Sequence, residues 1–141
     1  MPQKVKYDWS WVNTQIESIG DQLGEQNNIP AYVTGIPRGG LIPAVIFSHK
    51  YDIPFIELHT ACWGQEHDSV KERIIIFDDI SDTGDTFLKY TQHKFITAAL
   101  AYRRTSRFIP TLIGQTIYDD HWMVFPWEDV KAKAIQDYLV K

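Results

Sequence analysis

The chain has 141 residues and a net charge of −4, and it is predicted to form a single domain over residues 1–141 that is large enough to bury its own core. Its composition, with 44% hydrophobic and 23% charged residues, is typical of a globular protein. The sequence contains no block of Lys or Arg and no apolar run of membrane-spanning length, which argues against nucleic acid and membranes as partners.

The single cysteine, Cys62, excludes an intrachain disulfide framework and is typical of a protein in a reducing cytosol. The first residues are polar and do not resemble a secretory signal. A cytoplasmic location is therefore expected.

A helix is predicted to begin at Asp8 or Ser10, because either side chain can cap it. Its inward face is formed by apolar residues at helical spacing, namely Val12, Ile16, Ile19 and Leu23. A strand is expected at 31–36, followed by a tight turn at 37–40 and a helix at 41–51. The glycines of this turn allow the backbone to approach a ligand closely.

A short strand is predicted at 54–58, and a polar connection follows at 59–72. This connection contains His59, His67 and Asp68, but their spacing fits no standard metal cage. It is therefore expected to be a solvated loop.

The apolar run at 74–77 predicts a strand that is buried on both faces of a parallel sheet. Asp78 and Asp79 follow where this strand should leave the sheet, and a hydroxyl-rich turn at 82–86 leads into a predicted helix at 85–93. Ligands bind beyond the carboxyl ends of strands, and a turn entering a helix presents free N–H groups, so the turn predicts a phosphate site. The two carboxylates can hold sugar hydroxyls directly or through Mg²⁺.

Further strands are predicted at 95–101 and 114–118, and a charged helix at 127–140. Together these segments predict an α/β fold of three layers, with a mostly parallel central sheet flanked by helices and its ligand loops at one edge. A mildly acidic protein that binds a polyphosphate needs local compensation, which indicates a divalent metal ion.

Two other interpretations of the turn at 82–86 are open. Asp82-Thr83-Gly84 is also the triplet of aspartic proteases, although that fold is all-β and acids rather than apolar residues precede the triplet here. The other alternative is a solvated loop between strand and helix that binds no ligand.

The stretch from Ile74 to Thr86 resembles the phosphoribosyl-pyrophosphate signature of type I phosphoribosyltransferases, an apolar strand, two acids and a D-T-G-x-T loop. The resemblance implies that Asp78 and Asp79 act on the ribose, with Asp79 as a metal ligand, and that Asp82 is the general base. It also implies a loop for the 5′-phosphate formed by Ser81, Asp82, Thr83, Gly84, Asp85 and Thr86.

The stretch from Gly35 to Gly40, which includes the tight turn at 37–40, resembles the pyrophosphate loop of the same family. This resemblance implies that the departing diphosphate is bound by Arg38, Gly39 and Gly40. Family members have a strained or cis peptide here, so the same is expected of the turn at 36–38. The region at 59–72 corresponds to the family's mobile loop over the sugar, but it is short and lacks the usual Ser-Tyr pair.

The run from Trp122 to Glu128 resembles the base-capping hood of xanthine-guanine phosphoribosyltransferases and their archaeal hypoxanthine-guanine relatives, which carry W-x-x-x-P-W-[DE]. The resemblance implies a hood at about residues 115–130 in which Trp122 stacks on the purine and the Met123 carbonyl reads a base edge. Two core tryptophans, Trp122 and Trp127, are the alternative. Arg103 is the nearest match to the family's base-reading lysine, with Tyr102 as an offset alternative.

The expected function is a Mg²⁺-dependent purine phosphoribosyltransferase of purine salvage, which converts guanine, xanthine or hypoxanthine and phosphoribosyl pyrophosphate to the nucleoside monophosphate and pyrophosphate. The resemblance also implies a homo-oligomer, either a dimer or a tetramer. The alternatives are a non-catalytic nucleotide sensor of the same fold, which the short loop at 59–72 favours, a nucleic-acid-binding regulator, and a phosphoribosyltransferase for another base.

Overall fold

The computed structural model describes residues 3–64 and 73–129. In chain order its elements are β1 (Lys4–Lys6), α1 (Trp9–Glu25), β2 (Tyr32–Gly35), α2 (Leu41–Tyr51), α3 (Leu58–Trp63), β3 (Ile74–Ser81), α4 (Asp85–Leu88), a 3₁₀ helix (Thr91–His93), β4 (Ile96–Arg103), β5 (Leu112–Ile117) and β6 (Trp122–Val124). Most of the helix predicted at 127–140 lies outside the described residues, and residues 127–129 are not helical. Within the described ranges, no helix is long and apolar enough to cross a membrane.

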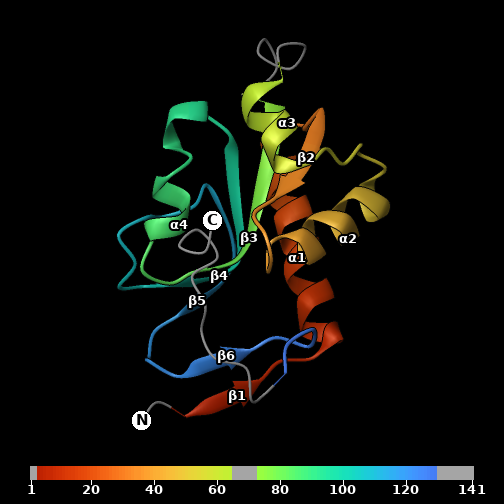
Figure 1. Ribbon diagram of the computed structural model, residues 1–141. Coiled ribbons are helices and arrows are strands. Elements are labelled where there is room, and N and C mark those ends of the chain that lie inside the picture. The colour runs from red at the N-terminus through yellow and green to blue at the C-terminus, as the bar shows by residue number, and fades with distance from the viewer. Residues whose placement is uncertain (1–2, 65–72, 130–141) are drawn as a thin grey trace.

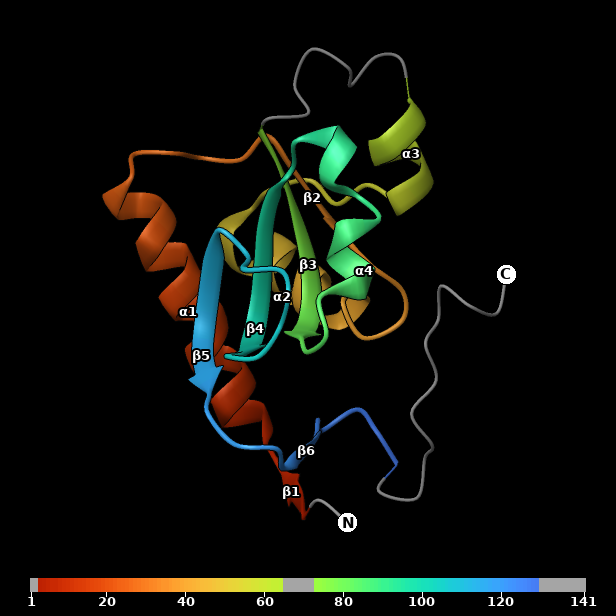
Figure 2. The same cartoon turned by 90° about the vertical axis from the view of Figure 1, so that its left-hand side faces the viewer.

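Strands β2, β3, β4 and β5 form one parallel sheet in that order, and helices cover both of its faces (Figures 1 and 2). On one face, α1 and α2 pack over a core that includes Ile75 and Phe77. On the other face, α3 and α4 cover a core that includes Ile74 and Ile76. Adjacent side chains of β3 thus enter opposite cores, as the pleat of a strand requires. The predicted three-layer α/β fold is confirmed.

The edge of the sheet next to β2 carries one further pairing. Phe55 forms a parallel bridge with Val33. The Val33 N–H donates to the Pro54 carbonyl, and the Ile56 N–H to the Val33 carbonyl, both at 2.9 Å. Phe55 therefore lies on the side of β2 that faces away from β3, and the chain order along the sheet reverses between β2 and β3. Such a reversal marks where ligands bind in open α/β sheets.

The prediction of a strand at 54–58 is wrong, because only Phe55 pairs with the sheet, through its single bridge to Val33. A helix, α3, begins at Leu58, because the carboxylate of Glu57 caps it by accepting the Thr60 N–H at 3.2 Å. The predicted solvated loop at 59–72 consequently starts as a helix, and its residues 65–72 lie outside the described ranges.

Strand β3 is longer than its apolar run predicts. It pairs with β4 as far as Ser81, so Asp78 and Asp79 lie within the strand and not beyond it. The helix predicted at 85–93 is divided into α4 and the 3₁₀ helix, because Tyr90 between them departs from helical angles, with φ −112° and ψ 5°.

The hood contains a strand that the sequence did not predict. Strand β6 pairs in parallel with β1, near the other end of the described chain. Flanking hydrogen bonds extend the pair: the Trp122 N–H donates to the Gln3 carbonyl, and the Tyr7 N–H to the Val124 carbonyl, both at 2.8 Å. Figures 1 and 2 place this pair beyond the carboxyl ends of β3 and β4.

Helix α1 depends on its predicted cap. The Asp8 carboxylate accepts the Trp11 N–H at 2.8 Å. Removing this acceptor in Asp8→Ala is expected to lower the free energy of unfolding by about 1 kcal/mol. Asp8→Asn retains an oxygen acceptor and should stay close to the wild type. Urea denaturation of the three proteins measures both effects, and an equal loss in the two variants would contradict a capping role.

Candidate functional site

The turn between β2 and α2 packs directly on the end of β3. The Ile36 N–H donates to the Phe77 carbonyl, and the Gly40 N–H to the Ile36 carbonyl, both at 2.9 Å. A Cβ at Gly40 would lie 2.2 Å from the Phe77 carbonyl oxygen, so only glycine allows this approach. The peptide bond between Pro37 and Arg38 is cis, as the resemblance implies, and the Arg38 side chain is exposed.

The side chains of Asp78 and Asp79 begin on opposite faces of β3, yet their carboxyl groups come within hydrogen-bonding reach of each other. Asp79 continues the row that faces α1 and α2, and its carboxylate lies against Gly39, where an added Cβ would be 2.0 Å from Oδ2. Asp78 continues the row that faces α3 and α4. On that side burial raises the pKa of the Tyr90 hydroxyl, and the negative charges of Cys62 and Asp78 raise it further. The structure therefore brings Asp79 against the turn that is predicted to bind pyrophosphate, with the carboxyl group of Asp78 beside it.

Both carboxylates also accept the N–H of the residue that follows them. The Asp79 N–H donates to Asp78 Oδ1 at 2.9 Å, and the Ile80 N–H to Asp79 Oδ1 at 2.7 Å. Burial raises the pKa of Asp79 to about 6; the hydrogen bond with Asp78 opposes this rise, and the charge of Glu128 adds to it. Asp79 is thus a desolvated carboxylate with a second negative charge nearby, an environment that a bound cation would relieve.

The loop after β3 rests on the segment that follows β4. Ser81 Oγ donates to the Phe108 carbonyl at 2.8 Å, and the Arg107 N–H donates to the Thr83 carbonyl at 2.9 Å. Gly84 has φ +95°, and a Cβ there would lie 2.6 Å from the Phe108 nitrogen, so this position also requires glycine. The hydrogen bonds among the described residues leave the N–H groups of Thr83 and Gly84 without an acceptor.

The side chains of this loop differ in their access to a ligand. Those of Asp82 and Thr83 are exposed, and those of Asp85 and Thr86 are partly buried. The Ser81 side chain is buried, and its hydroxyl is already bonded within the protein. The Asp85 carboxylate pairs with the Arg107 guanidinium.

The hood exposes the ring of Trp122 and buries the side chains of Met123, Val124 and Phe125 that follow it. Trp122 is 37% exposed, and the Lys4 ammonium lies 5.7 Å from its ring centroid. The Met123 side chain is buried in a cluster with Phe125. Trp127 stacks on Phe125 with ring centroids 5.1 Å apart, which fits a structural role for Trp127. The exposure of Trp122 argues against its being a core side chain.

Arg103, the predicted base contact, directs its side chain at other protein groups. Its Nε donates to Asp82 Oδ1 at 2.7 Å, and its two terminal nitrogens donate to the carbonyls of Asp119 and His121. Sequence reasoning missed this network, because its members are far apart in the chain and follow no motif. A weak signal existed only for β1, where Lys4–Lys6 alternates polar and apolar residues.

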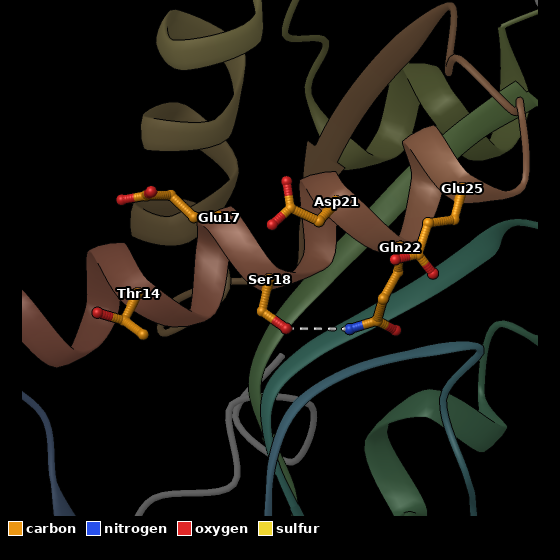
Figure 3. Close-up of a pocket in the computed structure, with 6 residues that line it drawn as sticks. All are labelled: Thr14, Glu17, Ser18, Asp21, Gln22 and Glu25. Atoms are coloured by element: carbon orange, nitrogen blue, oxygen red, sulfur yellow. Dashed lines mark hydrogen bonds between the residues drawn. The ribbon is translucent and has the colours of Figure 1, made fainter.

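A separate hollow runs along α1 and is lined by residues that the sequence did not predict (Figure 3). These residues are Thr14, Glu17, Ser18, Asp21, Gln22 and Glu25. Gln22 donates to Ser18 Oγ at 3.3 Å, and Lys50 Nζ lies 3.8 Å from Glu17 Oε1. The carboxylates recur at helical spacing on the outer side of the helix, which is typical of a solvated face.

Comparison with known proteins places this geometry in a family. No family model matches the chain. The chain is 30% identical to a xanthine-guanine phosphoribosyltransferase of Cereibacter sphaeroides, over 98% of this chain and 95% of that protein. It is 25% identical to a xanthine-guanine phosphoribosyltransferase of Nitratidesulfovibrio vulgaris, over 85% of this chain and 82% of that protein. The chain belongs to the type I phosphoribosyltransferase family.

Solved structures agree with this membership. A purine phosphoribosyltransferase from Pyrococcus horikoshii superposes with a TM-score of 0.73 and 27% identity, over 95% of this chain and 99% of that one. A protein from Neisseria gonorrhoeae with bound ppGpp superposes with a TM-score of 0.69 and 20% identity, over 93% of this chain and 92% of that one. At that identity the second likeness shows the fold alone.

The raised pKa of Asp79 predicts a pH-dependent stability. The folded state holds the Asp79 proton up to a pKa of about 6, against an ordinary value of 3.8. The folded state therefore binds more protons across this interval, and its stability falls as the pH rises through it, by on the order of 3 kcal/mol. Asp79→Asn removes this titration and is expected to be more stable than the wild type above about pH 6.5.

Urea denaturation at about pH 4 and about pH 7.5 checks this expectation, because the two proteins should differ little at the lower pH. The matched control is Asp120→Asn, at an exposed carboxylate of the hood. An Asp79→Asn variant that gains no stability at the higher pH would show that Asp79 is not destabilised by its surroundings.

Proposed function

We propose that the chain is a purine phosphoribosyltransferase that joins guanine, xanthine or hypoxanthine to the phosphoribosyl group of phosphoribosyl pyrophosphate. The observation that carries the proposal is the contact of Asp79 with Gly39. This contact joins the turn after β2 to a carboxylate of β3 at the place where the strand order reverses. The identity to a xanthine-guanine phosphoribosyltransferase over nearly the whole chain supports the purine class.

In the proposed reaction the bond between the anomeric carbon and a diphosphate oxygen breaks, and a bond from that carbon to a purine nitrogen forms. The diphosphate leaves with the bonding electron pair, and the base loses one proton. Positive charge develops at the anomeric carbon, much as in glycoside cleavage. The negative charges of Asp78 and Asp79 favour this charge while their oxygens hold the ribose hydroxyls.

The donor set fits a magnesium ion that is shared with the substrate. Mg²⁺ is usually held by one or two carboxylates together with substrate phosphates and water. Among the described residues no group of three or more His, Cys, Asp or Glu side chains could hold a metal alone. The buried Asp79 carboxylate, which lies against Gly39 of the turn after β2, is the proposed ligand. When bound, Mg²⁺ neutralises charge on the departing diphosphate.

The two phosphate ends of the substrate are assigned to the two loops. The N–H groups of Thr83 and Gly84, which have no acceptor among the described residues, would hold the 5′-phosphate, with Thr86 adding a hydroxyl. Ser81, Asp82 and Asp85 complete this loop. The exposed Arg38 and the backbone of Gly39 and Gly40 would hold the diphosphate.

The purine would lie between the hood and the loop after β3. The exposed ring of Trp122 would stack on it, an interaction worth about 1–3 kcal/mol, and the Met123 carbonyl would accept from a base edge. The Asp82 carboxylate, acting as the general base, would take the proton released by the purine. The side chains of Met123 and Val124 are buried, and neither distinguishes the three bases.

A second candidate is a nucleotide-binding protein of the same fold that performs no transfer. The protein of Neisseria gonorrhoeae that binds ppGpp has this fold, which favours keeping this candidate. Calorimetry with a nucleoside monophosphate separates the two candidates when it is combined with an assay for pyrophosphate. Family membership also leads us to propose a homo-oligomer, a dimer or tetramer, which light scattering measures.

The reaction is tested by incubating the protein with phosphoribosyl pyrophosphate, Mg²⁺ and each purine separately, and measuring pyrophosphate. We expect turnover with at least one base, and loss of turnover in Asp82→Asn with nucleotide binding largely retained, because an amide cannot accept the proton. No turnover with any base by a folded protein would overturn the transferase proposal. Unchanged turnover in Asp82→Asn would remove Asp82 from the role of base.

The contact between Gly39 and Asp79 gives a matched pair of variants. In Gly39→Ala the new methyl group meets the end of the Asp79 side chain, which can move, so the fold should survive. The displaced carboxylate should reduce turnover about 100-fold. In Gly40→Ala the methyl group meets the Phe77 carbonyl, which cannot move freely, so stability should fall. Urea denaturation and the pyrophosphate assay measure both; a fully active Gly39→Ala would contradict the role of this contact.

A further inference from the structure

One arginine side chain connects the loop after β3 to the hood. Arg103 ends β4, and only 12% of its side chain is exposed. Its Nε donates to Asp82 Oδ1 at 2.7 Å. Its terminal nitrogens donate to the Asp119 carbonyl and, at 2.9 Å, to the His121 carbonyl. The guanidinium thus makes three bonds, one to the loop and two to the backbone that leads directly into β6.

A series of side-chain hydrogen bonds also connects the backbone before β6 to Tyr7, which follows β1. The Asp119 carboxylate bonds to Nδ1 of His121, and the Tyr7 hydroxyl lies 2.6 Å from Nε2 of His121. Since a carboxylate only accepts, Nδ1 of His121 carries a proton and donates it to Asp119. Tyr7 in turn donates its N–H to the Val124 carbonyl. The residues before Trp122 are therefore held between Arg103 and the segment that follows β1.

We propose that Arg103 is a positioning residue, which sets the distance between the carboxylate of Asp82 and the hood strand that carries Trp122. The proposal rests on the proposed function, in which Asp82 and Trp122 contact the same purine. The positioning role requires the rigid, planar guanidinium group, because its three acceptors lie in different directions from one side chain. A lysine offers one flexible ammonium and cannot maintain all three bonds.

If Arg103 instead contacted the base directly, it would need different hydrogen bonds. To donate to a base oxygen, Arg103 would have to give up at least one of its present acceptors. A lysine could then replace it, because a single donor is sufficient for one hydrogen bond. Arg103→Lys therefore separates the two roles, with Arg103→Gln as the neutral variant and Arg104→Gln as the matched control. The Arg104 side chain is exposed and lies over the Tyr118 ring at 5.7 Å.

The first measurement needs no activity. The full chain is labelled with 5-fluorotryptophan, and the ¹⁹F resonance of Trp122 is assigned through Trp122→Phe. In the absence of ligand we expect the Trp122 resonance to shift or broaden in Arg103→Lys and Arg103→Gln, whereas the Trp63 resonance stays unchanged. In Arg104→Gln the resonances of Trp63 and Trp122 should both stay unchanged. Tyr7→Phe, which removes the hydroxyl bonded to His121, should shift Trp122 in the same way. A Trp122 resonance that is unchanged in both Arg103 variants overturns the proposal.

The second measurement is the steady-state rate. We expect kcat to fall about 10- to 100-fold in both Arg103 variants, with a smaller change in the KM of the base, because hydrogen bonds to charged groups are lost. A wild-type kcat and KM in Arg103→Lys would overturn the positioning role in favour of base reading. If the wild type itself has no turnover, the transferase proposal fails, and the fluorine measurement still decides whether Arg103 positions the hood.

Discussion

The hydrogen bond from the Ile36 N–H to the Phe77 carbonyl, with Gly40 packed beneath it, sets the spacing between the turn after β2 and the end of β3. The turn after β2 can approach the β3 backbone only because no side chain stands at Gly40. This approach brings Gly39 against the Asp79 carboxylate. Because the strand order reverses beside β2, the connections that leave β2 and β3 lead to opposite faces of the sheet, and neither covers this end of the sheet. The other parts of the site are placed relative to this contact.

The alternation of β3 gives the two adjacent acids different surroundings. Asp79 lies against the turn with Glu128 nearby, and Asp78, whose carboxyl group bonds to that of Asp79, also acts on Tyr90 beside α4. The ionised form of Asp79 is therefore unfavourable in the protein alone. Functional sites commonly retain such groups at a cost in stability, because a bound ligand recovers the free energy. The ionised Asp79 carboxylate therefore opposes folding, as a group retained for the proposed function would.

The sequence was sufficient for the elements whose patterns are local. The cap at Asp8, the bounds of α2 and the order of the two glycine turns follow from residues that are close together in the chain. The sequence predicts too early an end for β3, because Asp78 and Asp79 are residues typical of a loop. The pairing with β4 nevertheless continues to Ser81. The predicted site residues were located by resemblance, and the partners of Arg103 could not be, since Asp82 and the carbonyls of the hood meet only in the folded chain.

The parallel pairing of β1 with β6 joins residues 4–6 to residues 122–124. During synthesis the first strand therefore leaves the ribosome long before its partner exists, and it must wait while the sheet and most helices are already able to form. Closing so long a loop is slow and entropically costly, so contacts of this separation form late. The hood strand is consequently completed only after the turn that follows β2 and the loop that follows β3, which makes it the last part of the candidate site that the folding chain acquires.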